Sequence, residues 1–276
     1  MKRIFNRVVD LIRKVTEHKV TVYAAQATLF IIISALPLLM LVISLLKFIL
    51  PYDPVELKHI GIDFLPAAAI PLLYTVVDEV FTGATLPIVS ITSITALWAA
   101  SKGMVSLILG LDKVYSASDS RGYIKTRLLS LLYTAVFIVM ILATLLFFVA
   151  GKHLITVTRT TFPLISYILG AVYSFPVIVY VVILTFIFAV LYRLLPGVKI
   201  RFLRQIPGAF VAGLGWIAFT AGYSFYMNNY ADYSYIYGSL TAVVLMMLWL
   251  YFCMNIFLWG AEINCLFAER ENKIEE

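Results

Sequence analysis

The stretch that decides the fold is residues 238–267, which read GSLTAVVLMMLWLYFCMNIFLWGAEINCLF. Residues 238–261 carry no charged side chain. At about 1.5 Å per residue, a helix of this length spans ~36 Å, enough to cross the ~30 Å hydrocarbon core of a bilayer. Glu262 follows while its neighbours are still apolar. The stretch therefore predicts a membrane-spanning helix with a carboxylate near one end.

Three polar residues of this helix lie on one face. Steps of four and seven residues keep Tyr251, Asn255 and Glu262 in the same direction. Lipid cannot satisfy a carboxylate, so Glu262 must face protein or water. Two interpretations stay open. Glu262 either sits in the headgroups or pairs with a neighbouring helix for structural reasons, or it takes part in transport or switching.

Composition extends the membrane interpretation to the whole chain. Hydrophobic residues make up 62% of the 276 residues and charged residues only 13%, against about 25% charged in soluble domains. The net charge is +6. Because the basic residues are distributed as membrane topology requires, we expect no nucleic-acid partner. Cys253 and Cys265 lie ~18 Å apart on one predicted helix, too far for a disulfide. The three histidines show no metal-ligand spacing, so we expect no metal site and no cofactor.

The hydropathy pattern predicts an all-α, polytopic integral membrane protein with six transmembrane helices. Residues 1–20 form a basic amphipathic helix, expected on the anionic headgroups of the cytoplasmic leaflet, with docking to a protein partner as the alternative. Residues 21–267 form the transmembrane domain and residues 268–276 a polar cytoplasmic tail. The predicted spans are residues 21–50, 88–111, 128–150, 162–192, 207–230 and 238–267.

Basic residues gather on one side of this topology. With both termini taken as cytoplasmic, sixteen of the 21 lysines and arginines lie on the inner side. Such a bias is the rule for inner loops of membrane proteins. We therefore predict a multi-pass protein of the bacterial cytoplasmic membrane with both termini inside, whose partners are membrane lipids.

The segment between the first two spans is too long for a tight loop. Apolar residues at helical spacing predict two short amphipathic helices there, interfacial or re-entrant, on the outer side. The second of them carries Asp78 and Glu79, which we consider as the mouth of an ion path. A tyrosine-rich stretch before the last span includes Tyr233 and Tyr237. It fits an interfacial aromatic belt or the outer lip of a site for an amphiphile.

The first two spans carry polar stripes. Gln26 and Ser34 lie on one face of the first, and Trp98 and Lys102 on one side of the second, which ends near Asp112. A lysine facing lipid at mid-membrane costs roughly 2.5–3.5 kcal/mol. We therefore expect Lys102 to turn inward and be paired, or to line a wet cavity. The structural alternative is a snorkelling lysine or an ion pair, for instance with Glu262 or Asp112.

The fifth span carries a seam of small residues: Gly208, Ala212, Gly215, Ala218 and Gly222. Small residues at these spacings let helix backbones approach closely. The seam predicts a packing surface, and it is also a candidate surface for a homo-oligomer.

Several motifs together resemble one family. The N-terminal half has AAQA at 24–27, SALPLL at 34–39, LWAASKG at 97–103 and LDKVY at 111–115, and the C-terminal half has YRLLP at 192–196, PGA at 207–209, YGSL at 237–240 and GAEIN at 260–264. Their order and spacing resemble the YihY/BrkB family of bacterial inner-membrane proteins over nearly the whole chain. The resemblance implies six spans in the cytoplasmic membrane. Family members have been named virulence factors, linked to envelope lipid export, proposed as cation antiporters and once described as a tRNA-processing ribonuclease.

Three functions follow from these observations. The leading hypothesis is a transporter or flippase for a lipid or another amphiphilic envelope precursor, with Lys102 holding an anionic headgroup. The second is a proton- or cation-coupled solute transporter that uses Glu262, Asp112 or the outer carboxylates. The third is a non-transporting scaffold for envelope enzymes. We expect no enzyme, because ribonuclease chemistry needs clustered carboxylates or histidines on a wet face, and the chain shows none.

Overall fold

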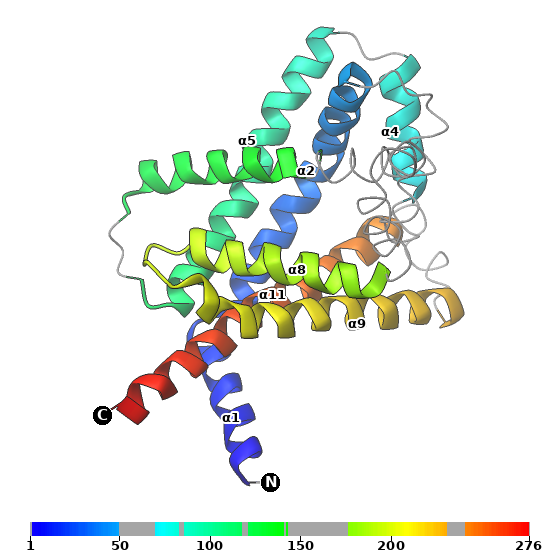
Figure 1. The fold of residues 1–276 in the computed structure, drawn as a ribbon. Coiled ribbons are helices and arrows are strands. Elements are labelled where there is room, and N and C mark those ends of the chain that lie inside the picture. Colours follow the sequence, from blue (N-terminus) through cyan, green and yellow to red (C-terminus); the bar gives the residue numbers. More distant parts are fainter. Residues whose placement is uncertain are drawn as a thin grey trace, which may run out of the picture. The chain divides into compact units, whose positions relative to one another are not determined.

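The computed structural model describes residues 2–49, 70–82, 86–117, 121–140, 142, 176–230 and 241–275. Every regular element in these ranges is helical, which confirms the predicted all-α class. The labelled elements are α1 (Lys2–Glu17), α2 (Val20–Ile49), α4 (Ile70–Thr82), α5 (Leu86–Val114), α8 (Pro176–Leu194), η2 (Phe202–Gln205), α9 (Ile206–Tyr230) and α11 (Thr241–Glu275) (Figure 1). A further helix, Tyr123–Met140, follows α5 in the chain.

The apolar helices are long enough to cross a membrane. Five of the described helices are long and apolar enough to span a bilayer. The bent pair Val9–Glu17 and Val20–Ala35 gives a sixth span if the two helices form one span. The helix after α5 begins at Tyr123, five residues before the predicted 128. The first of the two short helices predicted between the first two spans falls within residues 51–69, outside the described residues.

The chain divides into two compact units. One unit comprises residues 1–31, 102–130 and 181–276, and the other comprises residues 32–101 and 131–180. Both α2 and α5 contribute one part to each unit. Both units include residues of the predicted transmembrane domain, 21–267, whose bounds stay a prediction.

The second unit is built on apolar contacts. Val77 and Val80 of α4 pack on Ile43 of α2, and all three are buried. Val42 forms another cluster with Ile138 and residue Leu142. Helix α4 is the second short helix that the sequence predicted, and its valines hold it against the latter part of α2.

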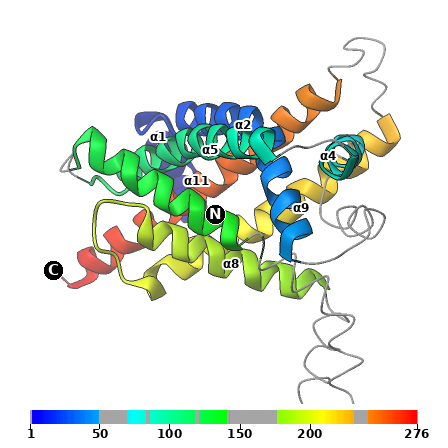
Figure 2. The same ribbon diagram turned by 90° about the horizontal axis from the view of Figure 1, so that it is seen from above.

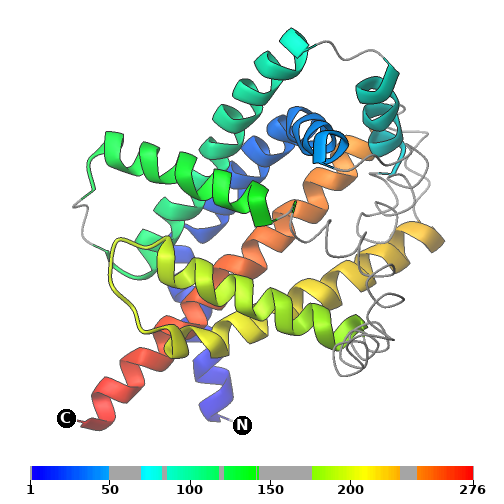
Figure 3. The ribbon, with the colours of Figure 1, turned by 45° about the horizontal axis from the view of Figure 1, so that its top comes forward.

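In the first unit, α9 and α11 lie side by side (Figure 3), and glycines form their contact. A Cβ atom added at Gly208 would lie 2.6 Å from the Asn264 side chain and closer still to the Gly260 carbonyl. A Cβ atom at Gly260 would lie 2.7 Å from Ala212 Cβ. Only glycine permits so close an approach of two helix backbones. The first part of the predicted small-residue seam thus packs within the chain, and the predicted homo-oligomer stays a prediction.

Helices α2 and α5 also meet through glycines (Figure 2). A Cβ atom at Gly103 would lie 3.1 Å from Ile31, and one at Gly110 would lie 3.0 Å from Tyr23. Since the residue number rises on one helix as it falls on the other, the two helices run antiparallel. This contact orients the residues beside the glycines, including Lys102.

Helix α11 does not end at the predicted boundary of the last span. It continues through the charged tail to Glu275, and α1 packs against it. Val15 is buried on α1, whereas Val9 and Ile12 are exposed. Part of the apolar face of α1 is therefore covered by protein.

The glycine contact generates a stability prediction. We expect Gly208→Ala to destabilise the protein by about 1–3 kcal/mol, because the new methyl group forces two helix backbones apart. The check is the thermal unfolding midpoint of the purified protein in detergent. Gly222→Ala is the matched control, since Gly222 on the same helix has nothing within 4 Å of its added Cβ. Equal unfolding midpoints for both variants would contradict the packing argument.

Candidate functional site

The predicted polar face of α11 lies inside the protein. Glu262 has no solvent exposure, and Asn255 is 5% exposed. Both lie in the membrane-capable stretch Val243–Ala268. Asn255 Nδ2 donates to the Tyr251 carbonyl at 2.8 Å, and its Oδ1 has no hydrogen-bond partner among the described residues. A carboxylate and an amide at such positions need partners from the protein, because lipid offers none.

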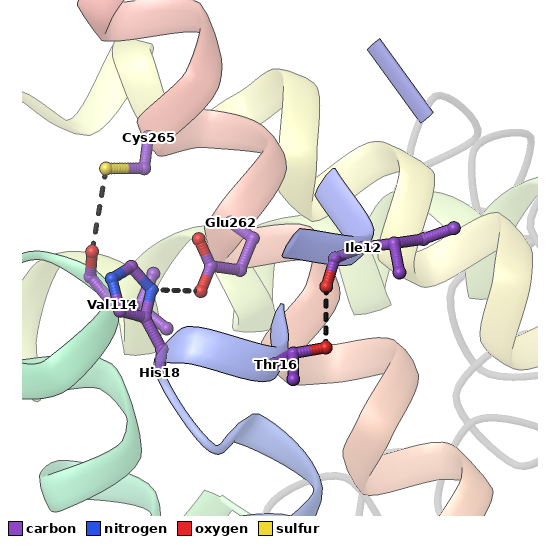
Figure 4. Close-up of polar contacts among 6 residues, drawn as sticks. All are labelled: Ile12, Thr16, His18, Val114, Glu262 and Cys265. Atoms are coloured by element: carbon purple, nitrogen blue, oxygen red, sulfur yellow. Dashed lines mark hydrogen bonds and ion pairs between the residues drawn. The ribbon is translucent and has the colours of Figure 1, made fainter. Parts of the chain in front are cut away.

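Glu262 finds its partner at the other end of the chain. His18 Nδ1 lies 2.5 Å from Glu262 Oε1 (Figure 4). A hydrogen bond between these two atoms needs one proton. Nδ1 carries it when the carboxylate is ionised, and Oε1 carries it when Nδ1 is unprotonated. The histidine side chain is 19% exposed, so the pair lies at the edge of the core. The two other ion pairs among the described residues, Arg13 with Asp10 and Arg13 with Glu17, are exposed.

His18 lies at the bend between α1 and α2. The two helix axes differ by 60°, and Lys19 has a φ of 53°. A non-glycine residue with positive φ ends a helix and turns the chain. Cys265, one turn beyond Glu262, donates its Sγ–H to the Val114 carbonyl at 3.5 Å. The bend, the end of α5 and α11 therefore meet around one buried carboxylate.

An amide network joins four elements beside this pair. The Tyr115 hydroxyl donates to Gln205 Oε1 at 2.5 Å, and Asn264 Nδ2 donates to the Gln205 carbonyl at 3.0 Å. Asn264 Oδ1 accepts the Gly208 N–H at 2.7 Å. Burial raises the pKa of the Tyr115 phenol, so the hydroxyl stays protonated and can donate. The network fixes the start of α9 against α11.

Asp112 and Arg121 hold the loop that follows α8. Asp112 Oδ1 accepts the Gly197 N–H at 2.6 Å. The Arg121 guanidinium donates to the Leu195 carbonyl at 3.0 Å and also to the Pro196 carbonyl. These hydrogen bonds satisfy backbone N–H and C=O groups of a loop that has no regular secondary structure. This geometry gives Asp112 a structural contact, and the predicted coupling role stays a prediction.

Lys102 lies beside an aromatic ring of α2, and its predicted inward orientation, paired or in a wet cavity, stays a prediction. Its side chain is exposed, and Nζ lies 5.3 Å from the centroid of the Phe30 ring on α2. Among the described residues, no carboxylate lies within ion-pair distance of Lys102, so the alternative pairs with Glu262 and Asp112 do not form. Neighbouring Gly103 packs against Ile31 of α2, and Lys102 lies beside this contact.

The other described candidates lie on α2, α4 and α5. Gln26 is exposed on α2, one turn before Phe30. Trp98 is 54% exposed, whereas Ser34 is buried, and both belong to the second unit. The outer candidates Asp78 and Glu79 are exposed on α4, and Tyr233 and Tyr237 lie outside the described residues. Gln26, Lys102, Asp112, Asn255 and Glu262 belong to the first unit, and the predicted roles of all the candidates stay predictions.

Sequence reasoning missed the residues that complete the buried pair and the network. His18 matches no metal-ligand spacing, and Gln205 belongs to none of the motifs described above. A signal was present for each: a histidine at the junction of two helical patterns, and an amide beside apolar residues. Among the described residues, no three His, Cys, Asp or Glu side chains lie close enough to hold a metal ion.

Comparisons with known proteins agree on one family. The sequence model of the family described as virulence factor BrkB matches residues 11–276. A ribonuclease-like protein of Bacillus subtilis, YfkH, is 27% identical over 267 residues, 97% of each chain. A UPF0761 membrane protein of Vibrio vulnificus is 34% identical over 85 residues, 31% of this chain and 27% of the relative. One from Photobacterium profundum is 36% identical over 81 residues, 29% of this chain and 25% of the relative. No solved structure matches the chain.

The His18–Glu262 contact generates a second prediction. We expect His18→Ala to weaken the attachment of α1 by about 1–3 kcal/mol, because a buried acceptor loses its hydrogen bond. Faster tryptic cleavage after Lys19 in the detergent-purified protein would report this. Glu17→Gln is the control, since its contact with Arg13 is exposed and worth little. Unchanged cleavage of His18→Ala would show that the pair does not hold the bend.

Proposed function

This chain belongs to the family described as virulence factor BrkB, a family of membrane proteins, and we propose that it moves a lipid or another amphiphilic envelope precursor across the bacterial cytoplasmic membrane. The observation that carries the proposal is the exposed charge of Lys102 in the middle of α5, which pairs with no carboxylate of the described residues. The proposal includes no enzymatic activity. The word ribonuclease describes the Bacillus subtilis relative.

The depth of Lys102 supports the proposal. Lys102 lies 16 residues after Leu86 and 12 residues before Val114, the ends of α5. These separations correspond to ~24 Å and ~18 Å of helix, so neither end of the helix is within reach of a lysine side chain. A lysine at mid-membrane costs roughly 2.5–3.5 kcal/mol when it faces lipid alone. A protein keeps such a group where it has a ligand to meet.

An amphiphile is the ligand that suits this position. It presents its apolar part to the membrane and its charged part to Lys102, so that it removes the cost of the bare ammonium. A water-soluble solute would need an aqueous path to the same place. A scaffold protein would gain nothing from an exposed lysine side chain in the middle of a membrane-spanning helix.

A second candidate function is proton- or cation-coupled transport, and the buried His18–Glu262 pair favours it. A proton shared between a carboxylate and an imidazole 2.5 Å apart can be exchanged when the contact opens. The pair lies at the bend of α1 and α2, where opening changes the arrangement of helices. This function and amphiphile transport are compatible, since coupling supplies the energy that a flippase needs.

The leading proposal is tested by translocation of fluorescently labelled phosphatidylglycerol in proteoliposomes. We expect Lys102→Gln to slow translocation about tenfold, which corresponds to ~1.4 kcal/mol of lost headgroup interaction. Lys102→Arg should keep most of the rate because it keeps the charge. Lys199→Gln is the control, since Lys199 is exposed in a loop. Wild-type rates equal to those of protein-free vesicles, for every lipid class tried, would reject amphiphile transport.

The second candidate is tested with Glu262→Gln, which keeps the shape and an acceptor oxygen but cannot ionise. We expect an imposed proton gradient to accelerate the wild type and to leave the variant unaffected. The measurement is the transport rate in vesicles with and without the gradient. Glu17→Gln serves as the control on α1. A variant that still responds fully to the gradient would exclude Glu262 as the coupling group.

A further inference from the structure

We infer that the side of α2 and α5 around Lys102 is a binding site for the anionic phosphate headgroup of a membrane lipid. The inference rests on the proposed function and names its substrate class. The surface, called here the α2–α5 face, belongs entirely to the first unit. Its exposed residues are Val22, Gln26 and Leu29 of α2 and Lys102, Leu109 and Lys113 of α5.

The polar groups of the α2–α5 face are arranged at intervals. Lys102 and Lys113 are 11 residues apart, which is three helical turns and ~16 Å on the same side of α5. The glycine contacts set Gly103 against Ile31 and Gly110 against Tyr23. In this antiparallel register Gln26 lies between the levels of the two lysines. A headgroup therefore meets a polar side chain about every 7–10 Å.

A cation–π contact with the Phe30 ring positions the Lys102 ammonium group. The ammonium lies 5.3 Å from the ring centroid, within the range of a cation–π contact. An aromatic ring stabilises a cation without neutralising it, unlike a carboxylate. Lys102 thus keeps its full charge for an anionic ligand, while its position on the face is held.

The charges on the face select an anion. Both ionised groups of the α2–α5 face are lysines, and the neighbouring carboxylate of Asp112 accepts the Gly197 N–H from the loop after α8. Gln26 adds an amide that can donate to a phosphate oxygen. A zwitterionic headgroup would bring a choline or ethanolamine cation next to these lysines. The face therefore favours a lipid with net negative charge.

The depth of the face selects a lipid over a free phosphate ion. If Lys113 lies at headgroup level, Lys102 lies ~16 Å deeper, near the middle of a ~30 Å hydrocarbon core. A free ion would have to lose its hydration to reach that level. A lipid carries chains that pack on Val22, Leu29 and Leu109, which are exposed beside the polar groups.

The inference is tested by native mass spectrometry of the full-length protein in detergent. The probes are phosphatidylglycerol and phosphatidylcholine with identical acyl chains. We expect tighter binding of phosphatidylglycerol to the wild type, and about fivefold weaker binding for each of Lys102→Gln and Lys113→Gln. Lys102→Arg should bind like the wild type, which separates lost charge from lost folding. Lys199→Gln is the control for a lysine outside the face.

Other outcomes would overturn the inference. Equal affinity of the wild type for the two lipids would remove the anionic selectivity, and so would an effect of Lys199→Gln equal to that of Lys102→Gln. A dimer that separates in Lys102→Gln, with lipid binding unchanged, would show that a second copy of the chain covers the face.

The binding measurement and the translocation measurement distinguish failure of the proposed site from failure of the proposed function. Lysine-dependent binding of phosphatidylglycerol without any translocation would reject the proposed function and keep the site. Translocation by a wild type that binds both lipids equally would keep the function and reject the site.

Discussion

The contact between His18 and Glu262 is the constraint on which the first unit depends. Glu262 has no solvent exposure and belongs to a helix apolar enough to cross a membrane. A carboxylate in such surroundings must be satisfied by the protein itself, since neither lipid nor bulk water reaches it. The partner comes from the bend between α1 and α2, 244 residues away in the chain. One buried group thereby ties the N-terminal helix, the first membrane helix and the last one together.

Lys102 is also a charged group on an apolar helix, but no buried partner within the described chain satisfies it. Asn264 of α11, Gln205 and Tyr115 form hydrogen bonds with one another within the chain. Lys102 instead lies on the outside of α5 against an aromatic ring. A polar group satisfied internally stabilises one arrangement of helices, whereas a charge on the outer surface is available to a ligand. This difference is why we assign structure to the first set and binding to the second.

Glycine contacts explain how both arrangements arise. Gly208 and Gly260 bring α9 and α11 close enough for an amide side chain to reach a backbone N–H. Gly103 and Gly110 bring α2 and α5 close together, and Lys102, next to Gly103, lies against the Phe30 ring of α2. Close backbone approach is the main means of helix association where the hydrophobic effect is weak.

The sequence by itself determined the helical membrane class, the length of the apolar helices and the presence of charges within them. These properties follow from local composition, because a hydrocarbon core accepts only long apolar segments with internal hydrogen bonds. It also singled out Glu262, Asn255 and Lys102, since polar groups in apolar runs are conspicuous. Only the tertiary structure decided their partners: His18 for Glu262, a loop N–H for Asp112, and the Phe30 ring for Lys102. Those outcomes depend on which faces of distant helices meet, and helix periodicity constrains a face without naming its neighbour.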